Sequence, residues 1–312
     1  MQIPRTFMLL ALVGCGDSDA PPPSLDVVAH FDPAQGQLPE GLAVRDGIAY
    51  VGFAPAASVV TVDAGGHVAP YATVPSTEGG TKGLTLGLAL DGAGELYVAQ
   101  ASFDPSVVAG VYRVPVGGGA ATAPFASDLA MTFPNGLAFD RSGRLFVADS
   151  GGAIFTVDVN GKVAEWLRDP LLAGDPNACP GLLPLPIGAN GIVVTEHDVW
   201  VTNTDHGALV RVPIAGDGTA GAARAVVQDC ALAGADGLAG DGSTFLVAVN
   251  GQDRIVEVDD RGVISELFVG APLDFPASIA TADEHTAFVT DLAFVRAQMG
   301  QNPAPALLTL VH

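Results

Sequence analysis

Apolar positions in this chain recur in short alternating runs that are separated by tight turns rich in Gly, Asp and Asn. One unit reads PNGLAFDRSGRLFVADS from Pro134, with a polar turn between a first run of small residues and a more apolar run over Leu145–Ala148. Such alternation is typical of β-strands, and turns of this composition join strands in hairpins. No amphipathic helical pattern extends over residues 25–312. We therefore expect an all-β protein.

The same unit occurs six times. A Gly, or a Ser in the last unit, opens each first run, and these anchors lie 46, 49, 55, 46 and 41 residues apart at Gly41, Gly87, Gly136, Gly191, Gly237 and Ser278. A period of this size with several strands per unit is typical of a β-propeller rather than an open solenoid. The sixth unit lacks a strand, and the segment Asp26–Phe31 precedes the first unit without a blade of its own. The sequence thus predicts a six-bladed β-propeller over residues 25–312, with the N-terminal strand closing blade six.

The first residues are typical of an export signal. Arg5 supplies a positive charge, the apolar run Phe7–Val13 is too short to span a bilayer, and Cys15 follows closely. We interpret residues 1–14 as a bacterial lipoprotein signal peptide, Cys15 as the lipidated residue and the Pro-rich residues 15–24 as a tether. The alternative is an ordinary cleaved signal with an incidental Cys. The lipoprotein interpretation predicts an exported protein at the outer membrane, the cell surface or in the periplasm.

Charge excludes some partners. The net charge is -21, whereas binding to nucleic acid needs clustered Lys and Arg. We expect no nucleic acid, membrane contact only through the lipid anchor, and a monomer. An acidic surface that only aids solubility is sufficient to explain the charge, although it also attracts cations. Gly117–Gly119 is interpreted as a hairpin turn, because no Lys-Ser/Thr pair of a phosphate-binding loop follows it.

Two further cysteines, Cys179 and Cys230, lie in segments that lead into consecutive units. An exported protein permits a disulfide between them. Two buried free thiols are the alternative, and the spacing alone does not decide between the two.

Polar residues precede four of the six anchors. In a propeller, the start of each inner strand and the end of each second strand meet at one mouth of the central channel. The residues before the anchors are Leu86 and Ala277 in units 2 and 6, and otherwise Glu40, Asn135, Asn190 and Asp236. Four oxygen donors without His or Cys suit Ca²⁺, with Mg²⁺ as a second option. The alternative is that these side chains only cap loops.

The units PEGL, PNGL, ANGI and ADGL at these positions resemble the senescence-marker-protein/gluconolactonase (regucalcin-like) family, which shares its fold with diisopropyl-fluorophosphatases and paraoxonases. The resemblance covers residues 25–312. It implies a divalent metal, usually calcium, held by Glu40, Asn135, Asn190 and Asp236, with Asp236 as general base or nucleophile in the hydrolysis of a lactone or ester. Non-enzymatic NHL-type repeats open in a similar way. The family's substrate-binding Arg and Asn-Asp pair is absent from Thr132–Gly136, so a sugar-acid substrate is not implied.

Further candidates stand at or just after the ends of the second strands: Asp149, Asn203, His206, Asn250 and Asp291. We predict that they face the same mouth and contact substrate, or that the Asp and Asn side chains cap turns. His206 is interpreted as a proton shuttle or as a solvated loop residue. Two functions remain open at this point: a metal-dependent lactone or ester hydrolase, and a non-catalytic propeller that binds a ligand or a protein partner.

Overall fold

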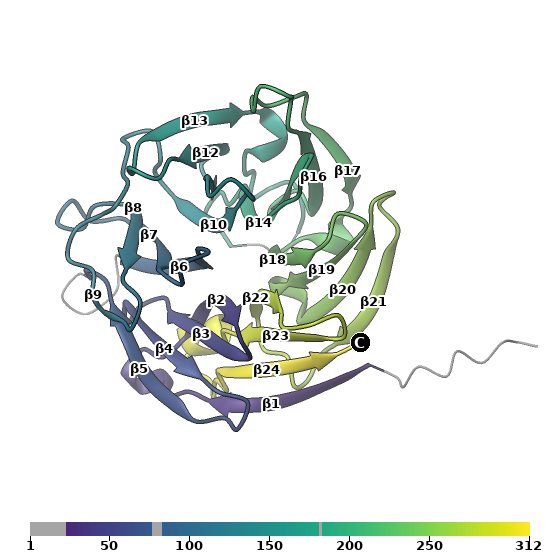
Figure 1. Cartoon of the computed structure of the whole chain (residues 1–312). Helices are drawn as coiled ribbons and strands as arrows, with labels where there is room; N and C mark the ends of the chain where they lie inside the picture. Colours follow the sequence, from purple (N-terminus) through teal and green to yellow (C-terminus); the bar gives the residue numbers. More distant parts are fainter. Residues whose placement is uncertain (1–22, 77–82, 181–182) are drawn as a thin grey trace, which may run out of the picture.

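The computed structural model of the chain describes residues 23–76, 83–180 and 183–312. These residues form six β-sheets arranged as blades around a central axis (Figure 1). The prediction of an all-β, six-bladed propeller is therefore confirmed. The predicted signal peptide, the lipidated Cys15 and the tether as far as residue 22 lie outside the described residues.

Blades 1, 3, 4 and 5 each contain four strands that follow one another in sequence, and the first of each set lies nearest the axis (Figure 1). The Asp- and Gly-rich turns of the sequence join the first two strands of these blades as hairpins. The strands are β2 (Pro39–Arg45), β3 (Ile48–Phe53), β4 (Ser58–Val62) and β5 (Val68–Thr73); β10 (Pro134–Phe139), β11 (Leu145–Asp149), β12 (Ala153–Val157) and β13 (Val163–Arg168); β14 (Ala189–Val194), β15 (Asp198–Asn203), β16 (Ala208–Pro213) and β17 (Arg224–Gln228); and β18 (Ala235–Gly240), β19 (Thr244–Val249), β20 (Arg254–Asp259) and β21 (Ile264–Val269).

Blade 6 joins the two ends of the described chain. Its strands are β22 (Pro276–Thr281), β23 (Thr286–Asp291), β24 (Ala306–Val311) and β1 (Ser24–His30). β1 pairs antiparallel with β24, with Ser24 opposite Val311 and His30 opposite Ala306, and the purple and yellow strands lie side by side in Figure 1. Closure by the N-terminal strand is confirmed, and it covers the outer edge of β24.

Blade 2 lacks the fourth strand that blades 1, 3, 4 and 5 contain. Its sheet contains only β6 (Gly83–Leu90), β7 (Leu96–Ser102) and β8 (Gly110–Val114). After β8, Gly117 and Gly118 adopt φ angles of 93° and 88°, which turn the chain so that β9 (Gly119–Ala120) pairs in parallel with β5 of blade 1. The interpretation of this glycine run as a simple hairpin turn was wrong, because the run carries the chain across to the neighbouring blade.

The core consists of six hydrophobic clusters, one between each pair of neighbouring blades. A seventh cluster includes Leu38 and Phe275, and α1 (Phe294–Gln298), which follows β23 in sequence, packs against it. Short 3-10 turns lie at Pro33–Gln35, Pro170–Leu172, Cys230–Leu232 and Asn250–Gln252. No helix within the described ranges is long and apolar enough to cross a membrane.

Candidate functional site

The four polar residues that precede the anchors occupy equivalent positions in four blades. Glu40, Asn135, Asn190 and Asp236 are the second residues of β2, β10, β14 and β18, and each is only 5–6% exposed. In every blade the pairing of the first two strands shifts register at this point. Such a bulge turns a side chain out of the normal alternation of the strand. We call these four residues the axial ring.

The anchor glycines allow neighbouring inner strands to approach closely. A Cβ atom added to Gly136 would overlap the backbone carbonyl oxygen of Asn190, and one added to Gly191 would overlap that of Asp236. Gly41, Gly87 and Gly237 stand in the same relation to the blade that follows each of them. Because no side chain fits there, the glycines hold consecutive members of the ring side by side around the axis.

The two carboxyl groups of the ring are buried and repel each other. Burial is the main cause that raises the pKa of Asp236 to about 7, while the amides of Asn250 and Asn190 oppose the rise by favouring the ionised form. Burial, together with repulsion from Asp236, raises the pKa of Glu40 well above its ordinary value. The buried Glu40 Oε2 has no hydrogen-bond partner among the described residues. A buried negative charge without a partner is costly, and a cation bound in the ring would offset this cost.

Three further polar side chains contact the ring. Each stands directly after the end of the second strand of its blade. The Asn135 Nδ2 donates to Ser150 Oγ at 3.3 Å, and the Asn190 Nδ2 donates to Thr204 Oγ1 at 3.0 Å. Asn250 Nδ2 donates to Asp236 Oδ2 at 2.9 Å. Sequence reasoning identified only Asn250 and missed the two hydroxyl groups, although their shared position in the repeat could have revealed them.

Two of the other sequence candidates, Asp149 and Asn203, act as caps in the structure. Asp149 is 1% exposed and accepts from the backbone N–H groups of Phe133 and Gly151, both at 2.8 Å. Asn203 Nδ2 donates to the carbonyl oxygens of Leu171 and Ala173. These contacts tie the loop before an inner strand to the turn after the second strand, as the capping alternative predicts.

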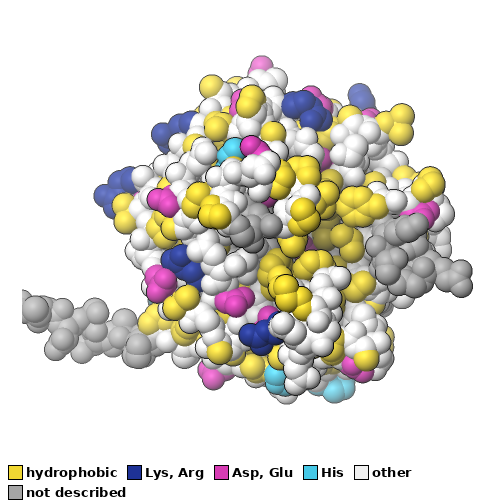
Figure 2. All heavy atoms as spheres, turned by 180° about the vertical axis from the view of Figure 1, so that it is seen from behind, with side chains coloured by type: hydrophobic (Ala, Val, Ile, Leu, Met, Phe, Trp, Pro, Cys, Tyr) yellow, Lys and Arg dark blue, Asp and Glu magenta, His cyan; other side chains and the backbone are white. Residues whose placement is uncertain are grey.

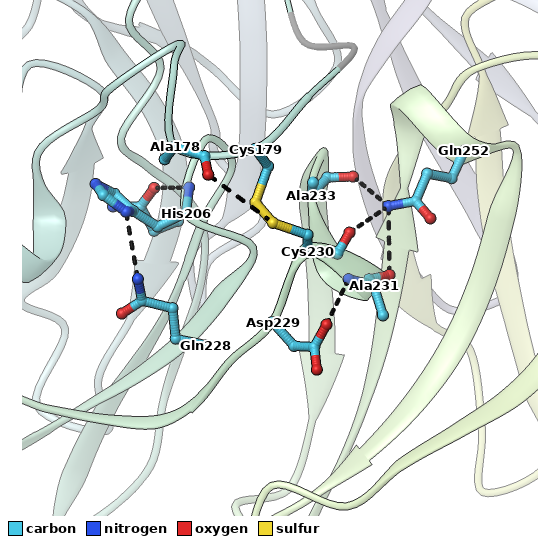
Figure 3. The surroundings of a disulfide bond; sticks show 10 residues. Ala178, Cys179, His206, Gln228, Asp229, Cys230, Ala231, Ala233 and Gln252 are labelled. Atoms are coloured by element: carbon cyan, nitrogen blue, oxygen red, sulfur yellow. Dashed lines mark hydrogen bonds between the residues drawn. A yellow bond between two sulfur atoms is a disulfide. The ribbon is translucent and has the colours of Figure 1, made fainter.

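The remaining two candidates also lie apart from the ring. Asp291 Oδ1 accepts from the backbone N–H of Asp274 at 2.7 Å, and burial raises the pKa of Asp291 to about 7. The His206 imidazole Nδ1 is 3.4 Å from Gln228 Nε2, on the outer strand β17 (Figure 3). The structure therefore does not bring His206 to the axial ring.

A cavity of about 320 Å³ adjoins the ring at blades 4 to 6. Thr204 and Asn250, which contact ring side chains, form part of its wall. Figure 2 shows hydrophobic side chains gathered around the centre of the face seen from behind. The cavity's remaining lining is partly apolar and partly acidic, with Arg296 as its basic group: Leu183, Ile187, Asp205, Gly251, Asp253, Asp274, Phe275, Val295, Arg296 and Gln301.

A disulfide ties together two loops. Cys179 and Cys230 are bonded with an S–S distance of 2.07 Å, so the structure selects the disulfide over two free thiols (Figure 3). Gln252 Nε2 also donates to the carbonyl oxygens of Cys230 and Ala233, at 3.0 and 2.8 Å. The loop before blade 4 is thereby fixed to the loop before blade 5.

These features define a six-bladed propeller with an axial ring of oxygen donors. No protein-family model matches the chain, and no curated protein matches it in sequence. Solved structures share the fold. A calcium-binding protein, regucalcin, from Agrobacterium tumefaciens has a TM-score of 0.64 and 18% identity, covering 93% of this chain and 94% of that one. The resemblance to the regucalcin-like family is confirmed at the level of the fold.

Two other similar structures show how varied this fold is in function. An auxiliary nutrient binding protein from Bacteroides thetaiotaomicron has a TM-score of 0.62 and 10% identity, covering 92% of this chain and 76% of that one. A PQQ-bound aldose sugar dehydrogenase from Streptomyces coelicolor has a TM-score of 0.60 and 15% identity, covering 94% and 99%. The fold thus hosts both enzymes and binding proteins, and the function must be argued from the site.

Proposed function

We propose that this protein binds a divalent cation, Ca²⁺ in preference to Mg²⁺, at Glu40, Asn135, Asn190 and Asp236, and hydrolyses lactones or esters there. The observation that carries the proposal is the pair of buried carboxyl groups in the ring, one of which has an orphaned oxygen. Two carboxylates balance the charge of a divalent cation, and amide oxygens complete a set that Ca²⁺ accepts. The described residues contain no cluster of three or more His, Cys, Asp or Glu side chains placed to hold a metal, so the amides are essential to this proposal.

In this proposal the chain's own residues bind and orient the substrate. When bound, the cation supplies a Lewis acid that polarises the carbonyl group of the substrate and stabilises the developing oxyanion. Asn250 holds the Asp236 carboxylate through Oδ2, and Asp236 accepts a proton from water or attacks the carbonyl carbon. The cavity beside Thr204 and Asn250 receives the rest of the substrate, and its apolar wall at Ile187 and Phe275 favours an uncharged group.

Hydrolysis is tested with a panel of lactones and aryl esters. We expect the purified wild-type protein to hydrolyse at least one class, to lose the activity on addition of a chelator and to regain it with Ca²⁺. The Asp236→Asn variant should be inactive, whereas Asp46→Asn, which removes an exposed carboxylate 92% accessible to solvent, should match the wild type. Activity that persists in the chelator or in Asp236→Asn would refute the proposal.

A non-catalytic binding propeller is the second candidate. It is favoured by the orientation of His206 toward the outer strand, which leaves the cavity without a histidine among its described lining residues. Calcium binding without any hydrolysis across the panel would support this candidate over the enzyme. The similarity in fold to a nutrient binding protein is consistent with it.

We also propose that the protein is exported as a lipoprotein anchored through Cys15. The disulfide supports an oxidising compartment, because disulfides persist outside the cytoplasm. Metabolic labelling with a fatty acid in a bacterial host should mark the wild-type protein and not Cys15→Ala. Equal labelling of the two proteins would contradict the anchor.

A further inference from the structure

The two ring amides are held by hydroxyl groups whose own protons are already used. Thr204 Oγ1 donates to the carbonyl oxygen of Ala235 at 2.8 Å, and Ser150 Oγ donates to that of Ala189 at 2.9 Å. A carbonyl oxygen only accepts, so each hydroxyl proton must point to the following blade. The hydroxyl oxygen is then left as an acceptor for the ring amide of its own blade.

This arrangement determines which end of each amide contacts the hydroxyl group. Only the Nδ2 group of an Asn side chain can donate, so the contacts of Asn190 with Thr204 and of Asn135 with Ser150 engage nitrogen. An amide rotated by 180° would set its oxygen against a hydroxyl oxygen that has no proton to offer. The Oδ1 atoms are therefore the ends that remain for a ligand.

We propose that Thr204 and Ser150 are positioning residues that make both ring amides present oxygen, so that the axial ring accepts a cation. This inference rests on the proposed function, since it concerns the same cation site. In blade 5 the residue at the equivalent position, Asn250, also holds a ring side chain, because it donates to the Asp236 carboxylate. Blade 1 has Ala54 there, which leaves Glu40 as the ring member without such support.

The chain contains a matched control for Thr204. Thr202 lies two residues earlier in the same blade and is also buried, at 1% exposure against 3% for Thr204. Its Oγ1 donates to the carbonyl oxygen of Asp236 at 2.7 Å, so it too links blade 4 to blade 5. Thr202 Oγ1 accepts from the backbone N–H of Gly191 and from no ring side chain. Val substitution at either position removes an inter-blade link, but only Thr204→Val also removes a hydrogen bond of a ring amide.

The test is calcium titration by calorimetry on wild type, Thr204→Val, Thr202→Val and Thr204→Ser. Thr204→Val should raise the Ca²⁺ dissociation constant by about tenfold or more, as is usual when a hydrogen bond that orients a metal ligand is lost. Thr204→Ser should restore the wild-type affinity. The dissociation constant of Thr202→Val should stay within about twofold of the wild type, although this variant should lose as much thermal stability as Thr204→Val. Ser150→Ala serves as a second variant and should also weaken binding by about tenfold.

The outcomes separate the inference from the proposed function. If the wild type binds no Ca²⁺, the proposed function fails and the inference with it. If the wild type binds Ca²⁺ and Thr204→Val binds it as tightly as Thr202→Val does, only the inference is refuted. A loss in Thr204→Val that Thr204→Ser does not restore would also refute it, because the hydroxyl group would not be the cause.

Discussion

Loss of the Cys179–Cys230 disulfide provides a quantitative test of how the loops beside the cavity are stabilised. The two cysteines are 51 residues apart in sequence, and the enclosed segment contains the whole of blade 4 from β14 to β17. The bond therefore restricts a long loop in the unfolded chain. In the folded protein it joins the loop before blade 4 to the loop before blade 5.

The magnitude follows from the length of the closed loop. Chain-entropy arithmetic for a loop of about 50 residues gives a stabilisation of about 4 kcal/mol. Unfolding entropy is about 2 cal/mol/K per residue, so for a propeller of this size the loss lowers Tm by about 6–7 °C. The Cys179 side chain is buried, and a serine in its place adds a smaller local cost.

The assay is thermal unfolding followed by circular dichroism, with and without reductant. Cys179→Ser, Cys230→Ser and the double variant should all unfold about 6–7 °C below the oxidised wild type, because either single change removes the bond. Reductant should bring the wild type to the same Tm and leave the variants unchanged. An oxidised wild type that unfolds at the temperature of the double variant would refute the reasoning.

Two further predictions concern other parts of the fold. The pKa of Asp291 rises from 3.8 to about 7, so the native state keeps a proton that the unfolded state releases, and the protein loses stability as the pH rises between these values. Relative to Asp291→Asn, the free energy of unfolding of the wild type in urea should fall by about 4 kcal/mol between pH 3.5 and pH 8. Parallel pH profiles of the two proteins would contradict this. Gly136→Ala should lower the free energy of unfolding by about 3 kcal/mol or more, because the added Cβ overlaps the carbonyl oxygen of Asn190. At Gly92 no atom lies within 4 Å of an added Cβ, so the free energy of unfolding of Gly92→Ala should stay within about 0.5 kcal/mol of the wild type.

The repeat made the fold predictable. Each unit carries its own strand alternation and turn residues, so local signals agreed with the global arrangement in every blade except blade 2. Blade closure could also be predicted, because Asp26–Phe31 had no other partner. The path after β8 could not, since a Gly run permits many turns and the pairing of β9 with β5 depends on a neighbouring blade.

The site was only partly predictable. Periodicity placed Glu40 and Asp236 at the same level of the channel, but contacts between blades decide what each side chain does. Asp149 and Asn203 end their strands in the same way as Val249 does, and their side chains turn to the backbone of the preceding loop. The residues one position later turn to the ring instead, and strand alternation alone does not show where a strand ends.

Calcium binding at the axial ring is the claim on which the account depends most. Equilibrium dialysis of the wild type, Asp236→Ala and Asp46→Ala against Ca²⁺ tests it directly, because both variants lose one negative charge and only one of these lies in the ring. We predict a single saturable site in the wild type and in Asp46→Ala and none in Asp236→Ala. A wild type without a saturable site, or equal binding by all three proteins, would contradict the account.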